Sequence, residues 1–303
     1  MGKTMFNKIG GQAVVEGVMM RAPGSVATAV RRPDGTIAVR RREYRSVTQR
    51  YRVFRLPVVR GAVALIESLG LGVGALMYSA EESAGETASE KTGRFSIALW
   101  GTVVLALLLG IGFFFYLPLL ITEAIGVRGS IGFNVVDGII RVAFLLLYIR
   151  AISMWKEMRR VLAYHGAEHK TIFTLESGRD LTVENAREFP TLHPRCGTSF
   201  LLIVMIVSVL VFVFLGRPDT IGERLIRFAF IPLIGGLSYE FLKLSARWAD
   251  RSWMAPLIRP GLFMQTMTTR EPDDSQLEVA IAALHAALGD RVNEREELLS
   301  DVG

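Results

Sequence analysis

The sequence predicts a mainly α-helical, polytopic membrane protein with four transmembrane helices, a small N-terminal β-hairpin, and cytoplasmic or interfacial helices. Hydrophobic residues make up 50% of the 303 residues and the mean hydropathy is +0.35, which is too apolar for an ordinary soluble domain. Charged residues still make up 21%, so the apolar residues are concentrated in blocks. The single cysteine cannot form an internal disulfide bond, so it is interpreted as a metal ligand or a buried apolar residue.

Residues 1–55 are expected to form a cytoplasmic segment that is rich in glycine and contains a β-hairpin. Residues 25–32 and 36–43 carry β-prone side chains on both sides of the turn sequence Pro-Asp-Gly at 33–35, and this arrangement predicts the hairpin. Residues 1–24 lack a compact apolar core followed by a small-residue cleavage site, so no cleavable signal peptide is expected.

Residues 56–94 are expected to form an amphipathic or re-entrant helix followed by a linker. The stretch 56–80 is long enough to cross a bilayer, but it contains Arg60, Glu67 and several glycines. Arg60 and Glu67 lie two helical turns apart on one side of the helix. This pattern favours a helix that lies in the membrane interface.

Four later stretches are apolar and long enough to cross a bilayer. They are residues 95–121, 133–154, 199–215 and 226–244. The second and fourth carry charged residues such as Asp137, Arg141 and Glu240, which predicts that these helices face the interior of a bundle or end early in the membrane interface. The chain therefore divides after residue 94 into transmembrane helices 1 and 2 (95–154), a cytoplasmic loop (155–198), transmembrane helices 3 and 4 (199–244) and a cytoplasmic or interfacial C-terminal region with an amphipathic helix (245–303).

The distribution of basic residues predicts the orientation of these helices. Lysine and arginine number 15 in residues 1–94, seven in 154–197 and six in 245–303, against one in 123–132 and two in 216–225. Because loops rich in lysine and arginine stay in the cytoplasm, both termini and the 155–198 loop are expected there. The net charge of +6 is then explained by contact with the lipid bilayer, and no nucleic-acid partner is expected. Association into a homo-oligomer stays open.

The 155–198 loop contains three of the four histidines and the only cysteine. The second transmembrane helix is expected to continue unbroken through residue 170. On that helix Glu168 lies about 60° to one side of His165 and His169 about 40° to the other, so the three share a face. Imidazole and thiolate are ligands that zinc and similar divalent ions prefer. We therefore expect a divalent metal ion, zinc by ligand type, to bind His165, His169, His193 and Cys196.

The spacing His-x-x-Glu-His is also the signature of inverted zincin metalloproteases, in which the glutamate is the general base. Glu168 is the corresponding candidate here. A tetrahedral shell filled by four protein ligands is typical of structural sites, whereas catalytic sites keep one position open. The sequence therefore leaves open a catalytic site and a structural clip. A third interpretation is that the histidines only bond to backbone and lipid head groups while Cys196 packs as an apolar residue.

Residues 10–21, GGQAVVEGVMMR, place isolated polar side chains among glycines and apolar residues. In a functional interpretation Glu16 is a further metal ligand or an acid/base, Arg21 binds an anionic group of the substrate, and Gln12 contacts the substrate. In a structural interpretation the segment leads into a strand, and Glu16 and Arg21 pair with each other or with charged residues of the helix that follows. Both interpretations stay open.

Four motifs in this order resemble the YqhQ-like bacterial membrane family, a domain of unknown function whose members are described as predicted metal-dependent enzymes. The motifs are GGQAVVEGVMMR at 10–21, Arg60-Gly61, YHGAEHK at 164–170 and HPRCGTS at 193–199. The resemblance covers residues 8–284 and implies a multi-pass protein of the bacterial cytoplasmic membrane, but it implies no substrate. It includes the candidate positions Gln12, Glu16, Arg21, His165, Glu168, His169, His193 and Cys196.

Together these patterns favour a metal-dependent hydrolase of unknown substrate at the cytoplasmic membrane face, with Glu168 and Glu16 as catalytic residues. Two alternatives belong to other classes. The first is a non-enzymatic, metal-stabilised scaffold or assembly factor that binds a protein partner. The second is a transporter subunit, which rests only on the charged residues within the second and fourth membrane helices, Asp137 among them.

Overall fold

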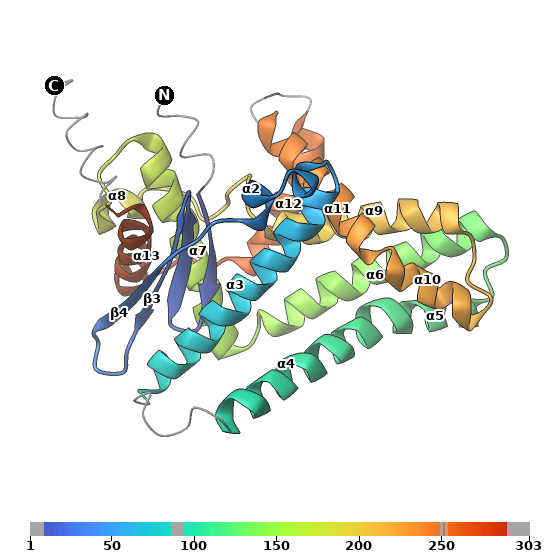
Figure 1. The fold of residues 1–303 in the computed structure, drawn as a ribbon, viewed down its shortest axis with the longest axis horizontal. Helices are drawn as coiled ribbons and strands as arrows, with labels where there is room; N and C mark the ends of the chain where they lie inside the picture. Colours follow the sequence, from blue (N-terminus) through green and yellow to red (C-terminus); the bar gives the residue numbers. More distant parts are fainter. Residues whose placement is uncertain (1–8, 86–93, 249–250, 252–253, 290–303) are drawn as a thin grey trace.

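The computed structural model describes residues 9–85, 94–248, 251 and 254–289. Part of the linker expected after the interfacial helix, and the last residues of the expected C-terminal region, lie outside these ranges. The described chain has two parts (Figure 1). A small β-sheet with helices on both faces forms one part, and a bundle of long helices extends away from it as the other.

The sheet is antiparallel and has four strands in the order β1-β2-β3-β4, each paired with the next along the chain. The strands are β1 (Gly10–Val14), β2 (Gly17–Ala22), β3 (Ser25–Arg31) and β4 (Ile37–Glu43). The pair β3–β4 confirms the expected hairpin, with Ser25 opposite Glu43 and Arg31 opposite Ile37. The glycine-rich segment before it forms a second hairpin, in which Gly10 lies opposite Arg21.

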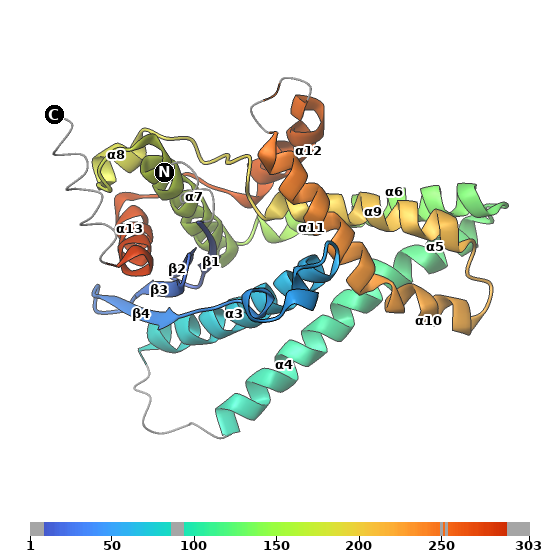
Figure 2. The same ribbon diagram turned by 45° about the horizontal axis from the view of Figure 1, so that its top comes forward.

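The two faces of the sheet pack against different helices, and Figure 2 shows the sheet between them. Helices α7 (Lys156–Ser177) and α13 (Asp274–Leu288) cover one face, and α3 (Val59–Ala84) lies against the other. Because side chains alternate along a strand, Val18 and Met20 of β2 enter the core below α7 and α13, whereas Met19 packs toward α3.

Helix α13 confirms the C-terminal helix expected from the sequence, and it lies in the main core of the sheet part. Asp273 and Gln276 form a capping box at its start. Its side chains Leu277, Leu284 and Ala287 are almost fully buried against the sheet and α7. A short helix, α8 (Val183–Arg187), also contacts α13.

The bundle begins with a long rod made of α4 (Arg94–Ile111), the π-helical turn η2 (Gly112–Tyr116) and α5 (Leu117–Ile125). Helix α6 (Ser130–Ile152) packs between α5 and α9 (Thr198–Leu215). The bundle is completed by α10 (Ile221–Ala229), α11 (Ile231–Arg247) and α12 (Ala255–Thr268), and α12 packs against α9.

Four helices of the described chain are long and apolar enough to cross a membrane, as the sequence predicted, and the chain is a membrane protein. They are residues Val59–Ala84, Gly101–Ile125, Thr198–Leu215 and Ile221–Ser245. This set contains α3, which was expected in the interface, and does not contain α6, which was expected to span. The interfacial position of residues 56–80 stays a prediction. It agrees with the packing of α3, since one side of that helix lies on the sheet.

A buried polar network joins α6 to its neighbours inside the bundle. Arg141 donates to Asp137 at 2.7 Å and to the carbonyl oxygens of Phe114 and Phe115 in the π-helical turn. Arg227 donates to Asn134 Oδ1 and to the carbonyl oxygen of Gly216, both at 2.7 Å. These bonds are internal to the bundle, so the charges expected in the second span fix helix positions and the π turn.

Helix α3 approaches α11 so closely that only glycine fits at the contact. A Cβ atom added at Gly61 would lie 2.8 Å from the carbonyl oxygen of Gly236. One residue earlier, Arg60 forms an ion pair with Glu240 of α11. The two short helices that precede α3, α2 (Val47–Arg50) and η1 (Arg52–Arg55), are held in place because Glu67 accepts hydrogen bonds from Ser46 Oγ and the Val47 N–H.

The expected continuous helix from the second span through residue 170 is wrong. Helix α6 ends at Ile152, a turn follows, and Trp155 has extended backbone angles before α7 begins at Lys156. Figure 1 shows α7 beside the sheet and α6 in the bundle. The break allows α7 to bury its apolar side chains against β1 and α13, and neither proline nor glycine marks it in the sequence.

Candidate functional site

Helix α7 presents three of the expected residues where it crosses the sheet part. It packs against β1, and most of its second half is buried. His169 and Glu168 are 1% and 5% exposed, and His165 is half-buried. All three side chains lie in one region of the molecule, between β1 and the loop that leads into α9, which agrees with their spacing on the helix.

His165, His169 and Cys196 bring three metal-ligating atoms together. One nitrogen of each imidazole and the Cys196 sulfur lie within 4.8 Å of one another. His165 Nε2 is 3.3 Å from Cys196 Sγ, and the two imidazole centroids are 4.5 Å apart. Three of the four expected ligands therefore converge across 31 residues of sequence, on two separate elements.

Backbone carbonyls assign the tautomer of both imidazoles. His165 Nδ1 lies 2.7 Å from the carbonyl oxygen of Thr268, and His169 Nδ1 bonds to the carbonyl oxygen of Thr191. A carbonyl can only accept, so each Nδ1 carries the proton and each Nε2 presents a lone pair. His169 Nε2 is buried and has no hydrogen-bond partner. This is the arrangement in which metal-binding histidines are usually held.

Cys196 lies just before the first turn of α9 and is buried. Its sulfur is 3.4 Å from the Thr198 N–H and 3.2 Å from the Thr198 hydroxyl. The backbone and the hydroxyl group of Thr198 therefore both contact the sulfur at the start of α9.

His193 lies beside the cluster in a different hydrogen-bonding state. Its Nδ1 accepts a hydrogen bond from the Arg195 N–H at 3.2 Å, so in the neutral ring Nε2 carries the proton. Its ring centroid is 5.7 Å from that of His169. His193 is not among the three residues whose ligand atoms converge. The geometry presents it as a donor next to the cluster, and its role as the fourth ligand stays a prediction.

Burial keeps two of the histidines, His169 and His193, neutral. It lowers the pKa of His169 and lowers the pKa of His193 to about 4, against an ordinary value of 6.5. Glu176 approaches His193 Nε2 at 3.5 Å, but a neutral imidazole forms no ion pair, and Glu176 pairs with Arg195 instead. Near pH 7 these rings are therefore neutral, as metal ligation and hydrogen bonding require.

Glu168 projects from α7 toward the first strand. A Cβ atom at Gly11 would lie 2.9 Å from Glu168 Cδ, so glycine gives the carboxyl group its room. Burial raises the pKa of Glu168, while His165, His193 and the Gly11 N–H act in the opposite direction. A carboxylate whose pKa is raised accepts a proton more readily than an ordinary one, as a general base must.

The other expected site residues are more scattered. Gln12 and Arg21 lie on the α3 side of the sheet, where Gln12 packs against Gly72 and the Arg21 guanidinium stacks 4.6 Å above the Tyr44 ring. Glu16 forms the tight turn between β1 and β2, with φ 51°. It pairs with Arg160 and accepts a bond from the Tyr164 hydroxyl.

These contacts place Glu16 two helical turns of α7 away from Glu168, because Arg160 precedes Glu168 by eight residues. The structure therefore does not bring Glu16 to the cluster, and its catalytic role stays a prediction. None of the structural ion pairs expected for Glu16, Arg21, Arg60 and Glu67 with one another is formed. Glu16 and Arg60 have partners on α7 and α11 instead.

The sequence analysis missed the residues that hold the site together. Gln265 of α12 is fully buried and binds the backbone of His193 in both directions, accepting from its N–H at 2.8 Å and donating to its carbonyl oxygen at 2.9 Å. Thr191 and Thr268 contribute only carbonyl oxygens, so their side chains give no signal. A lone glutamine in an apolar segment was the available signal for Gln265.

A cavity of about 900 Å³ opens beside the cluster. Glu168, His169, His193 and Cys196 line it, so the carboxyl group and the candidate ligands face the same space. The same wall continues over Gln12 and Arg21 to the start of α3 and the end of α11. The expected substrate-binding residues therefore share a cavity with the cluster, although they do not contact it.

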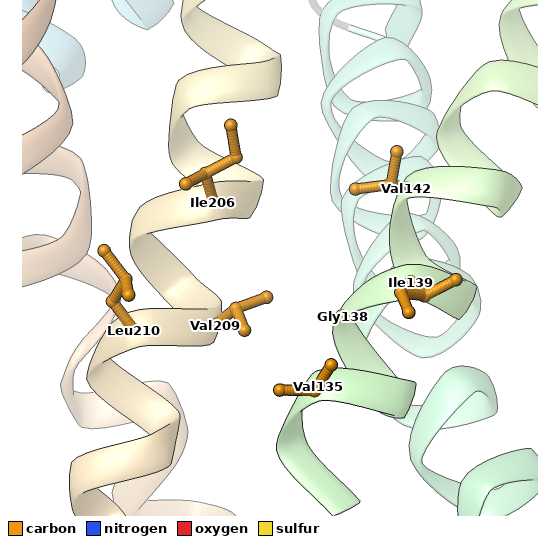
Figure 3. A pocket seen from close by; sticks show the side chains of 7 residues that line it. All are labelled: Val135, Gly138, Ile139, Val142, Ile206, Val209 and Leu210. Carbon is orange, nitrogen blue, oxygen red and sulfur yellow. The ribbon is translucent and has the colours of Figure 1, made fainter. Parts of the chain in front are cut away.

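A second hollow, of about 330 Å³, lies between α6 and α9 (Figure 3). Gly138 allows the close approach there, because a Cβ atom would lie 2.1 Å from a methyl group of Val209. All the lining residues are glycine, valine, leucine or isoleucine. This hollow offers no group for chemistry, and its outward side chains such as Ile139 and Leu210 are exposed as on a lipid-facing surface.

Comparison with known proteins gives a family and no activity. Residues 56–290 match a family described as "Protein of unknown function (DUF1385)". The chain is 35% identical over 296 residues to a protein of Bacillus subtilis (strain 168) named "Uncharacterized protein YqhQ", and the match covers 92% of each chain. No solved structure matches the chain.

Proposed function

We propose that this chain, which belongs to the DUF1385 family of YqhQ-like membrane proteins as its motifs predicted, is a metal-dependent hydrolase. Its ion would be held by His165, His169 and Cys196. One observation carries the proposal: both imidazoles are fixed through Nδ1 on backbone carbonyls, so their unprotonated Nε2 atoms converge with the cysteine sulfur inside the protein.

The residues fit zinc better than a harder cation. Two neutral nitrogens and one thiolate are the ligand types that zinc prefers, whereas magnesium and calcium require oxygen ligands. His169 Nε2 is buried without a partner, which is costly unless a ligand satisfies it. His165, His169 and Cys196 would hold the ion, and zinc at this position would supply a Lewis acid.

The other residues would move protons. In hydrolysis the oxygen of water bonds to a carbonyl or phosphoryl centre, and the bond to the leaving group breaks. Glu168 would take the proton from water and return one to the leaving group. His193, with its proton on Nε2, would donate a hydrogen bond to the oxygen on which negative charge develops.

The cavity supports a position at the cytoplasmic face of the membrane. Its walls include residues of α3 and α11, two of the four helices that are able to span a bilayer. The excess of lysine and arginine in residues 1–94 and 154–197 favours a cytoplasmic location for the sheet part and the cluster. We place the protein in the bacterial cytoplasmic membrane with both termini inside.

The metal proposal is tested by elemental analysis of the full chain purified in detergent. We expect about one zinc ion per wild-type chain, from the three-ligand geometry. His169→Ala and Cys196→Ala should lose it, and His193→Gln and the control His285→Gln should keep it. A wild-type protein without stoichiometric metal after growth in zinc would overturn the proposal, and metal loss in His193→Gln would restore the four-ligand shell.

Catalysis is tested by comparing wild type with Glu168→Gln. The glutamine variant should keep zinc and its melting temperature while losing turnover, measured by mass spectrometry after incubation with a bacterial lipid extract and with a peptide mixture. Removal of a general base typically lowers the rate by about 10²–10⁴-fold. Identical product profiles for wild type and the variant would exclude a role of Glu168 in catalysis.

A second candidate function is a structural clip in a scaffold protein. The observation that favours it is the connectivity of the cluster, which ties α7 to the start of α9 and, through Thr268, to the end of α12. In that case His169→Ala should lower the melting temperature sharply, and Glu168→Gln should change nothing. The two candidate functions therefore predict different results for Glu168→Gln.

A further inference from the structure

The cavity that contains the cluster has a second, cationic part. Five of its lining side chains are basic and two are acidic. The basic residues are Arg21, Arg55, Arg60, Arg195 and Lys243. This part is formed by β2, the short helices before α3, α3 itself and α11, so segments far apart in the sequence build it.

Two of the five cations are neutralised within the protein. Arg60 pairs with Glu240, and Arg195 pairs with Glu176. The acidic lining residue Glu67 is also occupied, since it accepts from Ser46 Oγ and the Val47 N–H at 2.7 and 2.6 Å. These three charged side chains are therefore satisfied by contacts within the protein.

The remaining three cations form no salt bridge among the described residues, although Lys243 acts on Glu240 at longer range. The Arg21 guanidinium carbon lies over the Tyr44 ring, 4.6 Å from its centroid, and an aromatic ring does not neutralise the charge. Arg55 donates Nε and Nη2 to the carbonyl oxygens of Thr48 and Gln49, which fixes the orientation of the guanidinium. Lys243 follows Glu240 by one turn of α11, and that carboxylate is already bound by Arg60.

Apolar side chains lie beside polar ones around this cationic part. Ala64 and Leu71 of α3 and Tyr239 of α11 line the cavity. On the outer surfaces of the same two helices Val59 and Phe241 are exposed, at 37% and 40%. A ligand that meets both surfaces must be anionic at one end and apolar at the other.

We infer that the cavity binds the phosphate-bearing head group of an anionic lipid, with Arg21, Arg55 and Lys243 as its cationic contacts. Guanidinium groups match phosphate in shape and charge, and a volume of about 900 Å³ accommodates a head group larger than phosphate alone. The hydrocarbon chains would remain along the exposed apolar surfaces of α3 and α11. Glu168 lines the same cavity, so the head group would lie near it, and only a catalytic consequence of that position rests on the proposed function.

The test measures lipid binding by the full-length protein, with native mass spectrometry after titration with phosphatidylglycerol or phosphatidylcholine. Wild type should prefer phosphatidylglycerol. Loss of two charge-assisted contacts in Arg21→Gln/Lys243→Gln should weaken its binding by about tenfold or more. The control Arg42→Gln/Arg259→Gln removes two exposed cations that do not line the cavity and should bind as wild type does.

Because Arg21 packs on Tyr44, the double variant is accompanied by Lys243→Gln alone, which removes an exposed charge without a packing contact. This single variant should weaken phosphatidylglycerol binding by about threefold. Equal binding of both lipids, or wild-type affinity in both variants, would overturn the inference. Competition by glycerol 3-phosphate at the same concentration as the lipid would overturn it too, and would assign the cavity to a soluble phosphate.

The same preparations separate this inference from the proposed function. Zinc content is measured in each sample, and His169→Ala should bind phosphatidylglycerol as wild type does, because it removes no cationic contact. Selective lipid binding without zinc would leave the lipid site standing and remove the hydrolase. Stoichiometric zinc together with equal binding of the two lipids would leave the metal site standing and overturn the lipid site.

Discussion

The helix bundle and the cluster on α7 both bury polar side chains, but they satisfy them differently. In the bundle, Arg141 and Arg227 direct their N–H groups at Asp137, Asn134 and backbone carbonyls. One nitrogen, Arg227 Nη1, is without a hydrogen bond there and lies 4.0 Å from Asp137 Oδ2. In the cluster, His169 Nε2 has no partner, and the atoms that surround it are other candidate ligands.

Polar groups that are hydrogen-bonded within the protein stabilise the fold, whereas a buried group without a partner is available to a ligand. A buried group without a partner is destabilising, so it persists where something binds it or where function requires it. Apart from Arg227 Nη1, the Asp137 network is satisfied by the protein itself, and the interpretation as a transport pathway receives no support from an open polar route there. The cluster and its cavity are the region where the proposed ligand would bind.

The largest effect is expected on breaking the closed network. Asp137→Ala leaves Arg141 without its carboxylate and removes the charge nearest Arg227 Nη1, in a region where Asp137 is 1% exposed. Removing one partner of a buried ion pair costs about 3–5 kcal/mol. We expect a large drop in melting temperature in detergent, measured by tryptophan fluorescence. A melting temperature equal to that of wild type would show that the network is dispensable for the fold.

The second effect concerns acidification of metal-free protein. The pKa of His193 is about 4 in the native state and 6.5 ordinarily, so between these values the unfolded state binds more protons. Stability is therefore present above pH 6.5 and decreases as the pH falls toward 4, by up to about 3 kcal/mol. His193→Gln should flatten this part of the profile, measured by urea unfolding in chelator. His169 has a pKa shifted in the same direction, so some dependence should remain.

A smaller effect is expected at the contact between β1 and α7. Gly11→Ala places a Cβ atom 2.7 Å from the Met19 carbonyl oxygen and 2.9 Å from Glu168 Cδ. Overpacking of this kind costs about 1–3 kcal/mol, and it should move the Glu168 side chain. The control is Gly10→Ala, where no atom lies within 4 Å of the added carbon. Equal melting temperatures for the two variants would contradict the close packing of Glu168 on the strand.

The smallest effect is expected at an exposed ion pair. Arg187 and Asp274 form a salt bridge at 2.7 Å, and their side chains are 58% and 59% exposed. Solvent screens such a pair, so Arg187→Gln should leave the melting temperature unchanged within error. Compared with Asp137→Ala, this variant tests whether burial decides how much an arginine–aspartate pair contributes to stability. A drop comparable with that of the buried pair would mean that burial does not separate the two regions.

Much of the fold follows from periodicity and composition. The four apolar helices, the β3–β4 hairpin and the terminal helix α13 correspond to apolar blocks, a Pro-Asp-Gly turn and a helical repeat in the sequence. Strands β1 and β2 were harder to predict because they are short and begin with glycine, and their strand character depends on pairing of β1 with β2 and of β2 with β3. The break between α6 and α7 depends on packing of α7 against the sheet, which has no local signal.

The site was predictable to the level of residue type. His165, His169 and Cys196 could be grouped because helical spacing places the first two on one face and the chain order brings the third to the same end of α9. The separate state of His193 could not be predicted. It follows from one backbone N–H two residues away and from the clamp formed by Gln265, 72 residues further along the chain.

The sequence by itself determined that this protein is embedded in a membrane, that it belongs to a particular family, and which side chains are able to bind a metal. Only the tertiary structure decided which nitrogen of each histidine is available, that Glu16 lies apart from Glu168, and that one cavity joins the cluster to three unpaired cations. The physical reason is that the type of each residue fixes only which chemistry its side chain is able to perform. Protonation state, burial and charge balance are set by carbonyls, donors and acids from segments that meet only in the folded chain.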